Sequence, residues 1–409
     1  MKWLLFAIKN VLRNRRRSLV TILIAAVGTA GVLVGGGFAL FTYESLAEMA
    51  ARDSGHLILA QRDYFNRDED TPMQYGLDNY SALRDKIELD PRVRMALPRV
   101  QFSGLISNGD KSAIFVGAGI EPEGEFSAKG PAMRVVSGSL LRSKTPPGAT
   151  NNSPEIVLGS ELAKLMKAEP GTGLTLLSTT TAGALNAVDV TVRGVVTVGV
   201  PEIDKRLAYV TLPTAQNLLL TDKASTLSVY LRETEQTEEM RGVVAAQFPD
   251  LALQTWRDQA FFYAAVRGLY NRIFGLLGMV IVIMVLFAVT NTLGMAVVER
   301  TREIGTLRAL GTLPSQIVRI FALEGLVLGA AGVVSGMLAA AGISVFLLFA
   351  DVQMPPPPGR SEGYPLHIDF SWELYAATLV SILAISIAAA WIVSRKAAAK
   401  PIVEALGHV

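Results

Sequence analysis

Four long stretches of apolar residues constrain this chain more than any other feature. About 20 helical residues are needed to cross the roughly 30 Å hydrocarbon core of a membrane. Each stretch reaches that length, is bounded by charged residues or proline, and holds no charged residue except Glu324: residues 19–41, 273–298, 321–349 and 374–393. A mean hydropathy of +0.37 agrees with this pattern. The sequence therefore predicts an α-helical membrane protein with four transmembrane helices.

The placement of basic residues indicates how these helices are oriented, because Lys and Arg collect on the cytoplasmic side of a membrane. The segment between the third and fourth stretches contains Arg360 as its only Lys or Arg. Three other segments, 1–18, 299–320 and 394–409, are rich in them: Lys2, Lys9, Arg13, Arg15, Arg16, Arg17, Arg300, Arg302, Arg308, Arg319, Arg395, Lys396 and Lys400. We therefore expect both termini in the cytosol and residues 42–272 outside it.

Residues 1–18 place apolar side chains at helical spacing beside Lys9 and Arg13. This pattern is typical of an amphipathic helix lying in the membrane interface, and a helical extension of the first span is an equal alternative. The first stretch, residues 19–41, is longer than the 7 to 15 apolar residues of a signal peptide. It is therefore expected to be an uncleaved anchor.

The segment 42–272 has the patterns of a folded α+β domain. Short β-rich runs bounded by turn residues predict strands at 112–116, 188–200 and 227–231. Helical spacing of apolar residues predicts helices at 160–167 and 237–248. Residues 146–154 and 172–187 have the polar character of loops. Basic and aromatic residues such as Arg99, Phe102 and Phe126 are suited to a binding face, but core packing explains them equally well.

Several kinds of chemistry have no support in the sequence. There is no cysteine, which excludes disulfides, Cys-based zinc sites and thiol nucleophiles. No P-loop, H-E-x-x-H or G-x-S-x-G motif is present, so no catalytic, cofactor-binding or metal-binding residue is predicted. His56, His367 and His408 are scattered, and the acidic run 68–70 is read as a solvated loop. With 38 basic against 36 acidic residues, no nucleic-acid partner is expected.

Ionisable residues within the spans are too few for an ion relay. Glu324 lies near the inner end of the third span and Glu373 at the outer edge of the fourth. We expect Glu324 to pair at the inner interface, for example with Arg319. Glycines at four-residue spacing are candidates for close helix packing, either within one chain or between two copies: Gly31, Gly35, Gly325, Gly329, Gly332 and Gly336.

The most specific segment follows the second span and reads Val298-Glu-Arg-Thr-Arg-Glu-Ile-Gly-Thr-Leu-Arg-Ala-Leu-Gly311. It predicts a short helix that ends at Gly311 and turns back at Pro314 into the third span. Ile304, Leu307 and Leu310 are expected to form its apolar face. From the residues alone, a simple connecting elbow is the stronger interpretation.

This segment resembles the signature of FtsX-like and MacB-like permeases, the membrane subunits of type VII ABC transporters. Residues 10–17 before the first span, the segment 157–163 and the ending 397–406 are also similar. In that family the helix after the second span docks into a separate ATPase. The resemblance implies docking residues on this coupling helix: Glu299, Arg300, Arg302, Glu303, Ile304, Gly305, Leu307 and Leu310.

The resemblance also implies an organisation and a function. Its parts are a cytosolic segment 1–18, spans 19–41, 273–298, 321–349 and 374–393, a periplasmic MacB-like core domain 42–272, a coupling helix and turn 299–320, a Pro-rich periplasmic loop 350–373 and a cytosolic tail 394–409. Residues 55–64 and the overall length look closer to the LolC and LolE branch of the family. The implied function is a non-catalytic permease in the bacterial inner membrane. It converts ATP hydrolysis into motion of its periplasmic domain and releases a lipoprotein or lipid. The implied partners are two copies of a cytosolic ABC ATPase carrying the ATP and Mg, a second permease copy or paralogue, and a periplasmic carrier. The alternatives are a MacB-like efflux permease with an adaptor and an FtsX-like scaffold that activates a hydrolase.

Overall fold

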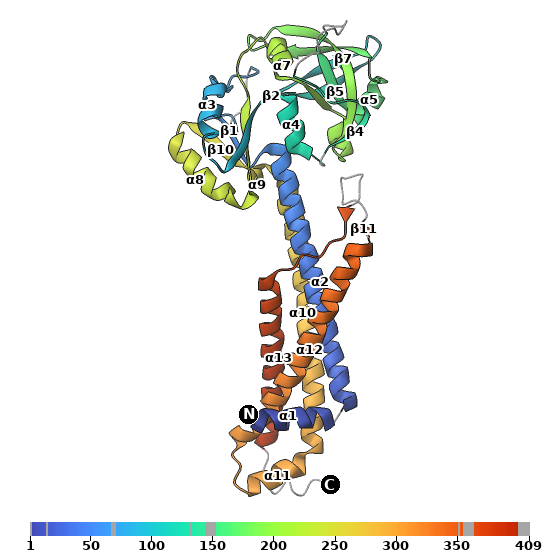
Figure 1. The fold of residues 1–409 in the computed structure, drawn as a ribbon, viewed down its shortest axis with the longest axis vertical. Helices are drawn as coiled ribbons and strands as arrows, with labels where there is room; N and C mark the ends of the chain where they lie inside the picture. Colours follow the sequence, from blue (N-terminus) through green and yellow to red (C-terminus); the bar gives the residue numbers. More distant parts are fainter. Residues whose placement is uncertain are drawn as a thin grey trace. The chain divides into compact units, whose positions relative to one another are not determined.

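The computed structural model describes residues 2–13, 15–66, 71–130, 133–143, 153–350, 352–354 and 364–399. The acidic run 68–70, residues 146–152, the proline run 355–358 and His408 lie outside the described residues. The chain divides into two compact units (Figure 1). The membrane unit contains residues 1–43, 266–353 and 365–409, and the α+β domain contains residues 44–265 and 354–364.

Long helices dominate the membrane unit because its apolar stretches must satisfy their backbone hydrogen bonds internally. Among the residues that the structure describes, four helices are long and apolar enough to cross a membrane. Each contains one predicted span: α2 (Arg15–Ser54), α10 (Phe261–Glu299), α12 (Pro314–Ala350) and α13 (Trp372–Ala398). A folded α+β domain lies between α2 and α10 in the chain. The predicted fold class, an α-helical membrane protein with a large α+β domain between its first two spans, is therefore confirmed. All four helices extend beyond the apolar stretches, because helical hydrogen bonding continues into the flanking polar residues.

The described residues of the membrane unit also form two shorter helices, α1 (Lys2–Arg13) and α11 (Thr301–Ala309). Figure 1 shows α1, in dark blue, lying across the ends of the long helices. It ends at Arg13 and α2 begins at Arg15, and its Ala7 is fully buried. This geometry favours a separate amphipathic helix over an extension of the first span.

The predicted glycine contacts lie within the chain. Gly325 and Gly329 face Ala390 and Ser386 of α13. Gly332 and Gly336 face α2, and a Cβ atom added at Gly332 would lie 2.4 Å from the Cβ of Ala25. Gly31 and Gly35 face Ile281 and Phe274 of α10. Glycine is therefore required on α12, where the helix backbones approach too closely for a side chain.

The α+β domain is built on a mixed sheet. Its strands within the described residues are β1 (Leu57–Gln61), β2 (Val93–Ser107), β3 (Ser112–Ile120), β4 (Arg134–Gly138), β5 (Glu155–Gly159), β6 (Gly173–Thr179), β7 (Leu185–Thr197), β8 (Leu207–Thr211), β9 (Thr226–Leu231) and β10 (Leu251–Thr255). Their order is β10-β1-β9-β2-β3-β8-β5-β7-β4, and β6 pairs with both β2 and β7. The β3–β8 and β5–β7 pairs are parallel, and the other pairs are antiparallel.

Short helices pack on this sheet: α3 (Tyr80–Ile87), α4 (Pro122–Lys129), α5 (Ser160–Met166), α6 (Pro201–Asp204), α7 (Leu212–Leu219), α8 (Thr237–Gln247), α9 (Trp256–Gln259) and the 3-10 helix η2 (Thr234–Gln236). Two further short strands, β11 (Gln353–Met354) and β12 (Tyr364–Pro365), lie outside this sheet. One core surrounds Phe102 and Phe115, whose rings meet edge to face with centroids 5.6 Å apart. A second core surrounds Leu59 and Val229.

Most local predictions for this domain are confirmed. Strands β3, β7 and β9 and helices α5 and α8 occupy the predicted segments. Arg99 and Phe102 are buried, and Phe126 packs against Tyr209, so the core interpretation of these residues holds. The loop predicted at 172–187 is wrong. It contains β6 and the start of β7, because buried Leu174 and Leu176 alternate with the exposed or half-buried Gly173, Thr175 and Leu177, as a one-sided strand requires.

Candidate coupling site at the end of the membrane helices

A short separate helix is present at the position predicted for the coupling helix. Helix α10 ends at Glu299, Arg300 departs from helical geometry, and α11 runs from Thr301 to Ala309. The Thr301 hydroxyl donates to the carbonyl oxygens of Val297 and Val298, each at 3.0 Å, which ties the turn to the last residues of α10. Gly311, with φ +95°, ends α11 in the left-handed conformation that glycine favours. Pro314 then begins α12.

The structure divides the eight predicted docking residues into a covered and an accessible group. Ile304 and Gly305 are buried, and the Arg300 side chain is only 11% exposed. Ile304 packs with Ile317 and Phe321 of α12. The expected single apolar face is therefore split, since Leu307 and Leu310 are exposed. The accessible group is Glu299, Arg302, Glu303, Leu307 and Leu310.

Arg300, a member of the covered group, is held by the buried carboxylate of Glu324. Arg300 Nη1 donates to Glu324 Oε1 at 2.9 Å, and Asn10 Nδ2 of α1 donates to the same oxygen at 2.6 Å. The guanidinium also lies over the Phe321 ring. The prediction that Glu324 pairs with Arg319 is wrong. It is five residues from Glu324 on one helix and so points about 140° away from it, whereas side chains meet at a spacing of three or four.

Further ion pairs join α11 and the end of α10 to the amino-terminal helices. Arg13 of α1 lies 3.6 Å from Glu303, and Arg17 of α2 pairs with Glu299. Arg300 Nε also donates to Glu303 at 2.9 Å, and this hydrogen bond lowers the pKa of Glu303 below its usual range. Each exposed pair contributes little by itself. Together they place carboxylates of α10 and α11 opposite arginines of α1 and α2.

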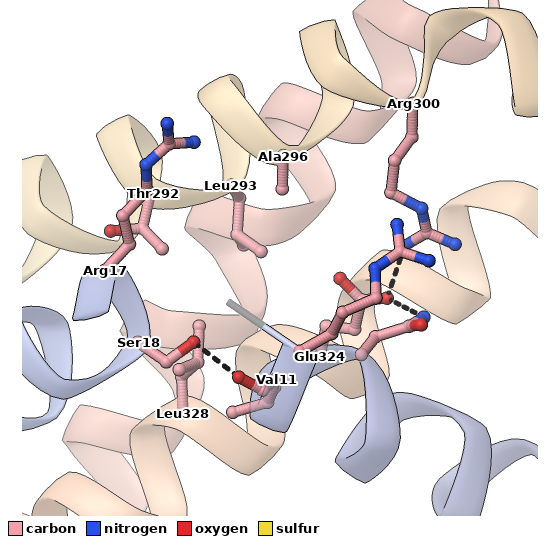
Figure 2. A pocket seen from close by; sticks show the side chains of 11 residues that line it. Val11, Arg17, Ser18, Thr292, Leu293, Ala296, Arg300, Glu324 and Leu328 are labelled. Atoms are coloured by element: carbon pink, nitrogen blue, oxygen red, sulfur yellow. Dashed lines mark hydrogen bonds and ion pairs between the residues drawn. The ribbon is translucent and has the colours of Figure 1, made fainter. Parts of the chain in front are cut away.

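A small pocket lies among these helices (Figure 2). It is lined by Val11, Arg17, Ser18, Thr292, Leu293, Ala296, Arg300, Glu324 and Leu328, with Asn10 and Arg13. The Ser18 hydroxyl donates to the Val11 carbonyl oxygen at 2.9 Å, as Figure 2 shows. The role of Asn10 was not predicted, although a lone amide among the apolar residues of α1 is a usable signal in the sequence.

The histidines and acids form no metal centre in the described part of the chain. His56 is buried, and its Nδ1 accepts a hydrogen bond from the Leu231 N–H at 3.1 Å. Burial lowers the pKa of His56 to about 4. The His367 ring stacks on Phe41. Glu373 is exposed at the start of α13. These contacts account for the packing of His56 and His367.

Comparison with known proteins agrees with this architecture. Residues 273–402 match the family described as FtsX-like permease C-terminal. The match includes α11 and the three helices around it, so the accessible and covered residues described above belong to the FtsX-like region.

Relatives extend the similarity into the rest of the chain. The lipoprotein-releasing system transmembrane protein LolC of Xylella fastidiosa is 27% identical over 256 residues, which cover 61% of this chain and 60% of that protein. The corresponding LolE protein of Haemophilus influenzae is 25% identical over 284 residues, covering 66% of each. The chain thus spans about 60% of the length of the LolC relatives.

Solved structures with a similar α+β domain include the periplasmic region of MacB from Actinobacillus actinomycetemcomitans. It is 14% identical, covers 51% of this chain and 92% of that structure, and has a TM-score of 0.34. The extracellular domain of YknZ from Gram-positive bacteria is also 14% identical, covers 49% of this chain and 98% of that structure, and has a TM-score of 0.33. With its four apolar helices and its similarity to named transmembrane proteins, this chain is a membrane protein.

Proposed function

We propose that this chain is the non-catalytic permease subunit of an ABC transporter in a bacterial inner membrane. A separate cytosolic ATPase, which carries the ATP and Mg, docks on the accessible group of α11. One observation carries this proposal. A short helix presents Arg302, Leu307 and Leu310 outward while Ile304 fastens its other face to α12.

The arrangement is suited to transmitting force. A simple connecting elbow has no reason to expose two leucines, with Leu310 79% exposed, beside a charged pair of residues. Packed interiors resist compression and move as units. A push on the exposed side of α11 therefore displaces the ends of α10 and α12 through Ile304 and the Arg300–Glu324 bond.

The orientation follows from the basic residues. With Arg13, Arg15, Arg16 and Arg17 on the cytoplasmic side, α11 also faces the cytosol, because Arg13 and Arg17 pair with Glu303 and Glu299. The domain that follows the first span is then periplasmic. An ABC transporter operates with two ATPase copies and two permease subunits, so a second copy of this chain or a paralogue completes the assembly.

The cargo we propose is a lipoprotein or lipid, released from the membrane to a periplasmic carrier. The names of the LolC and LolE relatives support a lipoprotein. No described group of the membrane unit forms a polar path of the kind that conducts ions, since Glu324 is held by Arg300 and Asn10. Motion of the outer domain acting on a cargo already in the membrane fits this arrangement.

The test is loss of the ATPase from a defined variant of the full chain. We expect Arg302→Glu combined with Leu307→Ser to abolish co-purification of an ABC ATPase from the native membrane, as read by native mass spectrometry. The matched control is Arg319→Glu with Leu12→Ser, an exposed arginine and an exposed leucine outside α11. Circular dichroism checks that both variants are folded.

Three outcomes decide the proposal. ATPase retained by the control and lost by the variant supports docking on α11. ATPase retained at the parental level by the variant refutes it. No ATPase with the parent chain refutes the transporter itself, whereas an ATPase with a bound hydrolase or adaptor in place of an acylated passenger would replace lipoprotein release by signalling or efflux.

A further inference from the structure

The carboxyl-terminal turn of α2 is capped entirely by groups of the α+β domain, to which residues 44–54 of this helix belong. The last four carbonyl groups of a helix have no partner within it. Here the Ala51 carbonyl accepts from the Gly55 N–H at 2.9 Å. The Arg52 carbonyl accepts from the Tyr230 hydroxyl at 3.3 Å. The remaining two accept from Arg99.

Arg99, in β2, is buried against this helix end. Its Nη2 donates to the Asp53 carbonyl oxygen at 2.7 Å and its Nη1 to that of Ser54 at 3.4 Å. A cation at this position also complements the negative end of the helix dipole. One side chain therefore joins the central strand β2 to the last two residues of α2.

The guanidinium is held in place from the other side by Glu125 of α4. Two parallel bonds run from Arg99 Nη2 and Nε to the Glu125 carboxylate, at 2.7 and 3.1 Å. Arg99 Nη2 also donates to Tyr230 of β9 at 2.6 Å. Lys129 of α4 adds an ion pair with the Asp53 side chain. Although burial alone would lower the pKa of Arg99, the neighbouring Glu125 raises it above its usual range, so the clamp stays charged.

Stability alone is a weak reason for this arrangement. Glu125 is only 1% exposed, and replacing a buried ion pair by apolar side chains of similar volume is often neutral or stabilising. What apolar side chains cannot reproduce is a directed connection to the carbonyl groups of another element. Arginine supplies it because its planar fork reaches a carboxylate and two carbonyl groups together.

We propose that Arg99 is a positioning residue that clamps the last turn of α2 to the sheet of the α+β domain, so that movement of α2 carries the domain with it. Helix α2 runs from Arg15 to Ser54 without a break. Without the clamp, we expect the backbone to bend at Gly55, which has φ +95°, so that the domain no longer follows the movement of α2. The use of the clamp in transport rests on the proposed function, whereas its existence does not.

A distance measurement within the α+β domain tests the clamp directly. The chain has no cysteine, so spin labels placed at Glu44→Cys on α2 and Asn217→Cys on α7, both exposed, report one distance in the full chain. We expect a single narrow distribution in the parent. In Arg99→Met/Glu125→Met, which removes both charges of the buried pair, we expect the narrow peak to be lost, with Arg99→Lys intermediate.

The matched control is Arg84→Met/Glu121→Met, another arginine–glutamate pair of this domain, whose side chains hydrogen-bond to each other at 2.9 and 3.0 Å and form no hydrogen bond or ion pair with α2. It should keep the narrow peak. Hydrogen exchange of β9 verifies that each variant is folded, and Arg99→Lys decides the matter if the double variant is not. A distribution as narrow as the parent's in the folded clamp variant would overturn the proposal.

A second measurement separates the clamp from the proposed function. With the clamp removed, we expect ATPase association to persist while ATP-dependent release of lipoprotein from native membranes falls to the level without ATP. Release at the parental level would overturn the role in transmission. Absence of an ATPase from the parent would count against the proposed function and leave the distance measurement unaffected.

Discussion

Replacing Glu324 by leucine tests the anchor of the coupling helix. The side chains of Glu324 and Arg300 are 5% and 11% exposed, so the substitution leaves a nearly buried guanidinium without its main acceptor. Breaking a buried pair in this way costs about 3–5 kcal/mol. Asn10 also loses the oxygen to which it donates at 2.6 Å.

Two companion variants sharpen this expectation. Glu324→Gln keeps a neutral acceptor for both donors, so it should cost only about 1–2 kcal/mol. Arg300→Met combined with Glu324→Leu removes both charges and should recover most of the loss, because no buried charge remains unpaired. Arg300→Met alone, Glu324→Leu alone and their double variant form a cycle that measures the coupling between these residues.

The free energies are measured by titrating the purified protein with SDS in mixed micelles and following tryptophan fluorescence. Hydrogen exchange of residues 301–309 reports whether α11 has come loose. We expect faster exchange in Glu324→Leu, with exchange in the α+β domain unchanged. A cost below about 1 kcal/mol, the level of an exposed ion pair, would refute the view that this bond anchors α11.

Two further predictions concern the helix contacts and the α+β domain. Gly332→Ala should destabilise the membrane unit by about 1–3 kcal/mol, since its Cβ would lie 2.4 Å from that of Ala25. The control is Gly342→Ala on the same helix, where an added Cβ would have no atom within 4 Å. It should be neutral or slightly stabilising in the same SDS titration. The α+β domain should lose stability as the pH falls from about 6.5 to 4, because the unfolded chain takes up a proton on His56 that the folded domain, with its pKa at about 4, does not. The loss approaches about 3 kcal/mol at the acid end. Hydrogen exchange of the Leu231 amide, whose N–H donates to His56, measures this loss of stability. The same pH dependence in a His56→Gln variant would contradict the view that His56 causes the loss.

Local patterns of the sequence predicted much of the fold. The four spans depend on hydropathy within about 20 residues, and β3, β9, α5 and α8 depend on apolar periodicity over shorter segments. The short helix α11 and its end at Gly311 were predictable for the same reason, because glycine and proline act on the backbone beside them. Strand β2 was not, since Pro98 lies within it and proline in a sequence argues against a central strand.

Tertiary structure decided which residues meet. The sequence by itself determined that a charged and apolar helix follows the second span, but not that Ile304 turns inward while Leu307 turns outward. Glu324 contacts Arg300, 24 residues away, and Asn10, 314 residues away, and no local pattern encodes such pairs. The Arg99 clamp is equally non-local, since β2, α4, β9 and the end of α2 meet only once the sheet has formed. Hydropathy and backbone propensity are properties of neighbouring residues, whereas burial and the choice of an ionic partner depend on packing between distant ones.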